Sequence, residues 1–372
     1  MAFPHPLPAA YPSMNEFSGF RERLPGLLRA LAVGIPAGAL FDWLDTPIPW
    51  LIGPMIAVAA VNLCGVRIAP VPYGRQAGQM LIGSAVSLYF TPPVVAALLA
   101  HIGAIAAGTA SAFVIGGLGA LVLGRLSGID AKSAFFSSIP GGAMAMTVLA
   151  ERAGAMIPPV AVAHSLRVSI LVIVLPFALT YGNIPLDIVP YRPSLALDIP
   201  VLALWLAGGV FVGWAAEKCR VQNGYLLAPI VLGALLTANE VPLSTVPHWL
   251  IQASQLLFGL ILGARYERAF FRRYRLFVPF ALVNAVFIIA ASVAAALAIA
   301  WAFGLDPATM VIATAPGGMP EMTIVAQALQ ISVPMVISFH LFRVFFVALG
   351  TQYIYAFGVW ARGRLRRGGA AE

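Results

Sequence analysis

Two arginines inside long apolar stretches are the side chains of this sequence best suited to chemistry. Arg167 follows His164 by three residues, and Arg343 follows His340 with the same spacing, so each pair shares one face of a helix. An arginine at the centre of a bilayer costs about 2.5–3.5 kcal/mol, so both guanidinium groups are expected to face the protein interior. There they would attract an anionic solute, while a histidine or an acid handles coupling protons. The alternative is structural, with each arginine neutralised by a protein acid or by the carbonyl groups of a broken helix.

A proline followed by two glycines precedes each arginine, as Pro140-Gly141-Gly142 and as Pro316-Gly317-Gly318. Proline removes a backbone donor, and paired glycines relax a helix further. The flanking segments have about ten residues each, too few to cross a hydrocarbon core of roughly 30 Å. The sequence therefore predicts half-helices that meet at each turn and present bare N–H or carbonyl groups to an ion or substrate. A kinked, tightly packed helix without a ligand is the competing interpretation.

Further polar residues complete the candidate solute site. Thr147 and Thr323 follow the two turns at equivalent positions, whereas Glu321 has only Ala145 as its counterpart. Glu321 is the candidate group for coupling to protons or sodium, with a salt bridge to either arginine as the competing role. The predicted substrate-binding residues are Pro140, Gly141, Gly142, Thr147, His164, Arg167, Pro316, Gly317, Gly318, Thr323, His340 and Arg343.

These residues belong to a tandem duplication. A shift of 176 residues superimposes the two turns and carries Asp130 onto Asp306. Between positions 137 and 168, 11 of 32 residues are identical after this shift, so the candidate site lies inside the duplicated unit. A unit of this length is far longer than a solenoid repeat. In a membrane protein, such a duplication is typical of secondary transporters.

Composition indicates a membrane protein. Sixty per cent of the 372 residues are hydrophobic and 10 per cent are charged, against roughly 25 per cent charged residues in soluble domains. Apolar runs such as Val94–Leu123 and Leu276–Trp301 are long enough to cross a bilayer, and each is predicted to form one crossing. The formal charge of +8 does not indicate nucleic-acid binding, because the basic residues cluster in short loops, as topology control requires.

The positions of the basic residues predict the topology. If both proline-glycine segments enter the membrane and return to the same side, 19 of the 22 Lys and Arg residues lie in the cytoplasm. If these segments cross instead, the split is 12 inside and 8 outside. Because cytoplasmic loops carry an excess of basic residues, the re-entrant version is favoured, with five crossings per half and both termini cytoplasmic.

The predicted fold class is an all-α polytopic membrane protein with two inverted repeats of about five transmembrane helices. Each repeat contains one discontinuous or re-entrant segment. The expected domains are a disordered cytoplasmic tail at 1–23, a first membrane repeat at 24–180, a linker at 181–200, a second membrane repeat at 201–359 and a basic cytoplasmic tail at 360–372.

The duplicated unit, its Pro-Gly-Gly turns followed by Met-Thr, and the Pro…His-x-x-Arg stretches resemble the AbrB-type membrane protein family over roughly 24–357. Members of that family carry labels such as regulator of gene expression and ammonia monooxygenase. The layout is also similar to citrate- and glutamate-type secondary transporters, which have a re-entrant segment before the last crossing. Auxin-carrier and bile-acid-carrier families instead place prolines in broken helices that cross the membrane, so this alternative stays open.

The expected function is secondary transport of a small anionic solute by alternating access in a bacterial inner membrane, coupled to H⁺ or Na⁺. The alternative is a membrane protein that influences gene expression indirectly, without transport or direct DNA binding. Neither an enzymatic activity nor a cofactor or metal is expected, because a copper monooxygenase needs clustered imidazoles and the five histidines are scattered. The expected partners are the solute and the lipid bilayer, not nucleic acid, and homo-oligomerisation is left open.

Overall fold

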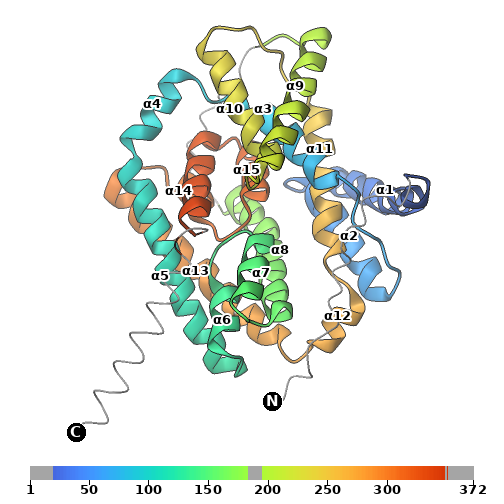
Figure 1. The fold of residues 1–372 in the computed structure, drawn as a ribbon, viewed down its shortest axis with the longest axis vertical. Helices are drawn as coiled ribbons and strands as arrows, with labels where there is room; N and C mark the ends of the chain where they lie inside the picture. The colour runs from blue at the N-terminus through green and yellow to red at the C-terminus, as the bar shows by residue number, and fades with distance from the viewer. Residues whose placement is uncertain (1–19, 183–194, 348–349, 351–372) are drawn as a thin grey trace. The chain divides into compact units, whose positions relative to one another are not determined.

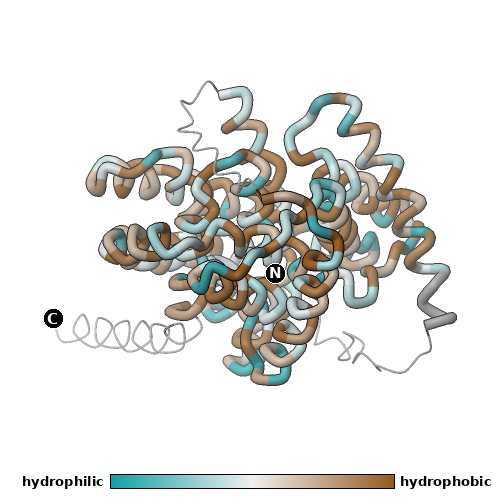
Figure 2. Tube along the Cα trace, turned by 90° about the horizontal axis from the view of Figure 1, so that it is seen from above, coloured by the Kyte–Doolittle hydropathy of each residue, from teal (hydrophilic) through white to brown (hydrophobic). Residues whose placement is uncertain are grey.

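The structure, a computed structural model, describes residues 20–182, 195–347 and 350. Throughout these residues the regular secondary structure is helical and contains no strand (Figure 1). Hydrophobic residues dominate the helices along most of their length (Figure 2). The predicted all-α fold is confirmed. The predicted tails and most of the predicted linker lie outside the described residues, although the first helix begins at Phe20, within the predicted N-terminal tail.

The helix order repeats once along the chain. The first half contains α1 (Phe20–Trp43), α2 (Pro49–Cys64), α3 (Gly74–Ser87), α4 (Pro92–Ala100), α5 (Ile102–Ser127), α6 (Ala131–Ser138), α7 (Ala143–Arg152) and α8 (Ile157–Tyr181). The second half contains α9 (Ile199–Lys218), α10 (Gly224–Ala238), α11 (His248–Ala264), α12 (Arg268–Arg273), α13 (Val278–Phe303), α14 (Pro307–Thr314), α15 (Met319–Ala328) and an apolar helix at Val333–Val347. The 176-residue shift carries α5, α6 and α7 onto α13, α14 and α15 residue for residue.

Local sequence explains why these bounds recur. Gly128 and Gly304 end α5 and α13 in the left-handed region, with φ of 68° and 64°, where glycine has no Cβ penalty. Asp130 and Asp306 then cap α6 and α14, accepting from Ser133 N at 2.9 Å and from Thr309 N at 2.6 Å. Each long helix is therefore followed at once by a short helix, in both halves.

Five of the described helices are long and apolar enough to cross a bilayer: Pro25–Trp43 of α1, together with α5, α8, α9 and α13. The pair α3 and α4 would add a sixth span if it is counted as one, although it is bent by 95°. The apolar helices α2, α10 and Val333–Val347 are shorter, with 10–17 residues against the roughly 20 that a straight crossing needs. The chain is thus a multi-pass membrane protein, whereas ten crossings stay a prediction.

One expected crossing has a different form. Val94–Leu123 is predicted to form one crossing, but the chain breaks at His101 into α4 and α5. With 26 residues and a length of about 39 Å, α5 spans a bilayer without α4. The counterpart of α4 is α12, which is basic where α4 is apolar.

The helices form two compact units. The first unit comprises Met1–Gly78 and Gln252–Arg272. Its core contains Ala30 of α1, Val58 of α2, Leu260 of α11 and Ile68 of the loop after α2. The backbones of α1 and α2 are in close contact at Gly53. A Cβ on this residue would lie only 2.5 Å from Ala37 O.

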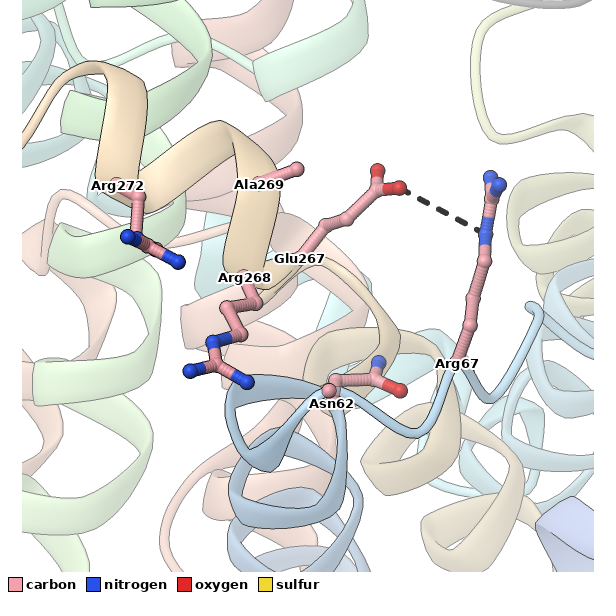
Figure 3. Close-up of a pocket in the computed structure, with 7 residues that line it drawn as sticks. Asn62, Arg67, Glu267, Arg268, Ala269 and Arg272 are labelled. Carbon is pink, nitrogen blue, oxygen red and sulfur yellow. Dashed lines mark ion pairs between the residues drawn. The ribbon is translucent and has the colours of Figure 1, made fainter.

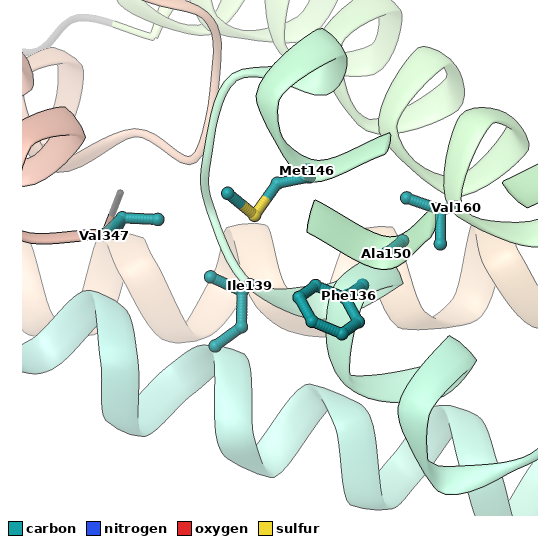
Figure 4. Close-up of a cluster of buried hydrophobic side chains, with 6 residues drawn as sticks. All are labelled: Phe136, Ile139, Met146, Ala150, Val160 and Val347. Atoms are coloured by element: carbon teal, nitrogen blue, oxygen red, sulfur yellow. The ribbon is translucent and has the colours of Figure 1, made fainter. Parts of the chain in front are cut away.

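The second unit comprises Gln79–Ile251 and Arg273–Glu372. In it α5 packs against α13 and α6, while α8 packs against α6, α7 and α13, and α14 packs against α13. A buried cluster of Phe136, Ile139, Met146, Ala150, Val160 and Val347 joins α6, α7, α8 and the last described helix (Figure 4). This packing places both proline-glycine turns in the same unit.

Candidate solute site at the two broken helices

Both proline-glycine segments are discontinuous helices. α6 ends at Ser138 and α7 begins at Ala143, with Gly142 as its N-cap. α14 ends at Thr314 and α15 begins at Met319, with Gly318 as its N-cap. No side chain caps α7 or α15 through a hydrogen bond. Among the described side chains, the first backbone N–H groups of both helices therefore have no acceptor, and their positive partial charge favours an anion.

The first of these segments returns toward the point where it began. Lys132 Nζ at the start of α6 donates to Ala153 O just after α7, at 3.0 Å. Met156 N donates to Ser133 Oγ at 2.8 Å. Phe136 and Ile139 of the α6 segment pack with Met146 of α7 between these ends (Figure 4). A segment whose two ends are joined in this way is typical of a re-entrant hairpin, which supports the favoured version of the topology.

Arg167 is 1 % exposed and binds backbone carbonyl groups from both turns. Its Nη1 donates to Ser138 O at 3.0 Å, and its Nη2 donates to Ile139 O at 3.4 Å. Its Nε donates to Pro316 O at 2.9 Å, across to the second turn. The two proline-glycine turns therefore converge on a single guanidinium group.

Arg343 is 3 % exposed and binds only its own turn. Its Nη1 donates to Ala315 O at 2.6 Å and its Nη2 to Gly317 O at 2.8 Å, with a longer contact of 3.5 Å to Thr314 O. Its Nε is buried and has no hydrogen-bond partner among the described residues. The repeat equivalent of the Arg167–Pro316 bond would be Arg343 Nε to Pro140 O, and this bond is not formed.

Of the two roles predicted for the arginines, this geometry favours neutralisation by half-helix carbonyls. The carbonyl groups at the C-terminal ends of α6 and α14 carry negative partial charge and have no partner within their own helix. Arg167 and Arg343 supply that partner. Their positive charge still acts on whatever lies beside the turns, although their N–H groups are mostly occupied.

The two histidines are fixed as neutral tautomers by their partners. A guanidinium group can only donate hydrogen bonds, and a carbonyl oxygen can only accept them. Because Arg167 Nη2 donates to His164 Nδ1 at 3.0 Å, the Nε2 of that ring carries the proton and donates to Phe136 O at 2.9 Å. His340 is held in the same way, 2.8 Å from Arg343 Nη2 and 3.1 Å from Ile312 O. Adding a proton at Nδ1 would break the arginine contact, so a coupling role for either histidine is disfavoured.

Glu321 is buried in the first turn of α15 and forms no ion pair with Arg167 or Arg343 within the described residues. Its carboxylate lies directly against Gly318, where a Cβ would be 2.9 Å from its carboxyl carbon. A negative charge in this place is stabilised by the N-terminal end of α15. The competing role as an arginine salt bridge therefore finds no support in the geometry.

The N-terminal end of α7 has a polar amide in place of this acid. Gln222 Nε2 lies 3.0 Å from the point that a Cβ would occupy on Gly142. The next residue, Asn223, accepts a hydrogen bond from Gln79 Nε2 at 3.0 Å, which fixes the loop between α9 and α10. Gln222 is missing from the predicted site because the loop carries no motif and its repeat counterpart is Pro47, since α10 follows α2 with a shift of 175 residues.

The remaining predicted residues have local roles. Thr147 Oγ1 donates to Ala143 O and Thr323 Oγ1 to Met319 O, both at 2.8 Å, so each hydroxyl proton is used within its own helix. Pro140 lies at the centre of a tight turn in which Gly141 N donates to Ile139 O at 2.9 Å. Gly141 and Gly317 leave room for Met146 and Met322, which pack beneath the two turns.

Multiple apolar spans and paired broken helices in a duplicated chain define a polytopic membrane protein with an internal repeat. The family described as "Transition state regulatory protein AbrB" matches residues 20–358, and the chain belongs to this family. The resemblance stated from the sequence is thereby confirmed.

Two relatives show how far this likeness extends. The Escherichia coli (strain K12) protein "Putative regulator AbrB" is 24% identical over 331 residues, covering 87% of this chain and 93% of its own length. The Bacillus subtilis (strain 168) protein YhjN is 24% identical over 342 residues, covering 85% of this chain and 89% of its own length. The likeness therefore covers most of this chain and most of each relative.

Proposed function

We propose that this protein is a secondary transporter that moves a small anionic solute by alternating access at the two proline-glycine turns. The observation that carries the proposal is the unequal bonding of two equivalent arginines. Arg167 Nε bonds to Pro316 O, whereas Arg343 Nε is buried without a partner among the described residues. In transporters built from inverted repeats, exchanging the conformations of the two halves converts one access state into the other. The second state would form the Arg343–Pro140 bond and break the Arg167–Pro316 bond.

The charge balance supports an anion as the solute. Arg167, Arg343 and Glu321 are the charged side chains that are buried within the described part of the chain. With both histidines neutral, these groups leave one positive charge in excess, which is costly in a membrane unless an anion balances it. The N-terminal end of α7, beside Gln222, lacks the acid that Glu321 provides at α15. We place the solute there, in the position that the Glu321 carboxylate occupies in the other half.

Glu321 is the proposed coupling group. It is buried, carries no hydrogen bond to a described residue and sits one turn from the Arg343-bound carbonyls. Protonation or sodium binding at this carboxylate would change the net charge that attracts the solute. This linkage would couple uptake of the solute to an ion gradient.

Flux measurements on the full chain reconstituted in liposomes test the proposal. The panel holds small carboxylates and phosphates with amines of similar size, under imposed proton or sodium gradients. Saturable, gradient-driven uptake of an anion is expected, and Gly142→Leu should abolish it by filling the space beside Gln222. Gly117→Leu is the matched control, because a Cβ there meets nothing within 4 Å. A preference for cations, or unchanged flux in Gly142→Leu, would contradict the proposed site.

The relative named as a regulator favours one alternative, an indirect influence on gene expression without transport. The same liposome experiment separates the two functions. An indirect regulator shows no saturable flux with any member of the panel, whereas a transporter does.

A further inference from the structure

A second candidate site lies in the first unit, where the loop after α2 meets the segment that leads into α12. Asn62, Gly65, Arg67, Glu267, Arg268, Ala269 and Arg272 line a cavity of about 380 Å³ there (Figure 3). Three arginines and one glutamate give the lining a net charge of +2. None of these residues belongs to the broken helices, so the solute site does not account for this concentration of positive charge.

The backbone holds two of the arginines in place. Asn62 is buried, and its side chain accepts from Ile68 N at 2.6 Å and donates to Ile68 O at 3.4 Å. These bonds fix the loop that carries Arg67. Arg268 Nη1 donates to Cys64 O at 3.2 Å, which anchors that guanidinium against the end of α2.

Gly65 makes this approach possible. Its φ of 105° lies in the left-handed region, which other residues avoid. A Cβ on Gly65 would also lie 2.9 Å from Arg268 Nη1, so any side chain there would push this guanidinium away.

Most donors of the three guanidinium groups remain available. Arg272 has no hydrogen bond or ion pair to a described residue, and it lies on the same face of α12 as Arg268. Arg67 faces Glu267 at 3.7 Å, with side-chain exposures of 74 % and 49 %, so this pair contributes little and is easily exchanged. Several guanidinium forks beside an open cavity match the oxygens of a phosphate group, which arginine binds at two points.

We propose that this cavity binds a phosphate group, either from the head group of an anionic phospholipid or from a soluble phosphate. Arg268 and Arg272 supply the contacts, and Arg67 exchanges Glu267 for the phosphate. The position suits a lipid because Phe270 and Phe271 lie beside these arginines on α12, the short helix that precedes the membrane-spanning α13. Basic residues next to a membrane helix attract anionic head groups over about one Debye length. The site does not depend on the proposed transport function.

Native mass spectrometry of the detergent-purified full chain provides the test. The protein is mixed with equal amounts of phosphatidylglycerol and phosphatidylcholine of identical acyl chains. Phosphatidylglycerol should bind preferentially, and this preference should fall about tenfold in the Arg268→Gln, Arg272→Gln double variant, as expected for losing charge-assisted hydrogen bonds. Arg273→Gln is the matched control, because Arg273 lies on α12 but does not line the cavity.

A parallel titration with sodium phosphate against sodium chloride distinguishes the source of the phosphate. Phosphate binding that the double variant loses, without a lipid preference, supports the proposal and assigns a soluble ligand. Elution on gel filtration verifies folding, and Arg272→Gln alone replaces the double variant if that variant aggregates. The proposal is overturned if the wild-type protein prefers neither ligand, or if Arg273→Gln loses as much binding as the double variant.

Discussion

Arg167 and Arg343 occupy equivalent positions in the two halves of the chain and hold different sets of partners. A guanidinium has five N–H donors in a fixed plane. Arg167 uses this plane to join carbonyl groups of both turns and the ring of His164. Arg343 binds three carbonyl groups of one turn and leaves Nε unused. A lysine could bind only some of the partners of either arginine, since its ammonium is a compact group without the planar fork.

The first prediction compares Arg167→Lys with Arg343→Lys. Both variants lose the planar fork, but only Arg167→Lys also loses a formed Nε bond, to Pro316 O. Arg167→Lys should therefore lower the free energy of unfolding by about 1–2 kcal/mol more than Arg343→Lys does. Denaturant unfolding in detergent micelles measures the difference. Equal losses would show that the Nε bond does not distinguish the two halves.

The second prediction concerns the Glu321 carboxylate. Glu321→Gln should leave solute binding intact while transport no longer responds to the ion gradient, because the neutral amide cannot take up the coupling ion. Gly318→Ala should produce the same uncoupling, since the added methyl would collide with the Glu321 carboxylate. Gly117→Ala is the control, because the added methyl meets nothing within 4 Å. Gradient-driven and exchange flux in liposomes are compared, and full coupling in Glu321→Gln would remove this residue from the mechanism.

Among the elements, the four half-helices α6, α7, α14 and α15 are stabilised mainly by the residues packed around them. Each has 8 or 10 residues, too few for a stable isolated helix. An aspartate caps the beginning of α6 and of α14, and an arginine holds the carbonyl groups at the end of each. Methionines beneath the turns then set how closely the successive half-helices approach.

The third prediction tests that packing with Gly141→Ala. The added methyl would lie 2.7–2.8 Å from three atoms of Met146, so the methionine or the turn must shift. Overpacking of this kind typically costs about 1–3 kcal/mol. Gly117→Ala on α5 adds the same methyl where nothing lies within 4 Å, and it should cost little. The free energies of unfolding of both variants are compared in detergent. Equal values would mean that the turn accommodates the added methyl without strain.

At the scale of the whole molecule, one contact bears on the topology. Arg67, in the loop after α2, lies 3.7 Å from Glu267, in the segment before α12. Segments in contact outside the apolar helices lie on the same side of a membrane. The re-entrant version of the topology places both segments in the cytoplasm, whereas crossing proline-glycine segments would place them on opposite sides. This contact and the bonds that join the ends of the α6–α7 segment are both expected for an inverted repeat, which stays a prediction.

The fourth prediction uses the two native cysteines, Cys64 and Cys219, which are both exposed. The re-entrant topology puts both in the cytoplasm. A membrane-impermeant maleimide added to intact cells should label neither, whereas permeabilised cells should show both labelled. Val241→Cys, in a variant without the native cysteines, is the control and should react from outside. Labelling of Cys64 or Cys219 in intact cells would contradict the inverted repeat.

The sequence by itself determined the class of fold and the position of the repeat. Apolar runs with few charges need no tertiary information to predict helices in a membrane, because the bilayer leaves backbone groups no other partner. Residue identity after a 176-residue shift predicts the duplication, and Pro140 and Pro316 predict the broken helices. The cost of a charge inside a bilayer predicts the burial of Arg167 and Arg343. Local effects, such as a proline breaking a helix, act within a few residues and can therefore be predicted from one sequence.

Only the tertiary structure decided which groups meet. Arg167 and Arg343 share the same His-x-x-Arg-Val pattern, yet one bridges both turns and the other leaves Nε unpaired among the described residues. The break of Val94–Leu123 at His101 and the approach of Gln222 to Gly142 also depend on helices far apart in the chain. Backbone carbonyl groups are the main partners of both arginines, and every residue carries one. Side-chain patterns therefore could not reveal these partners, because packing alone selects which carbonyl groups face the guanidinium plane.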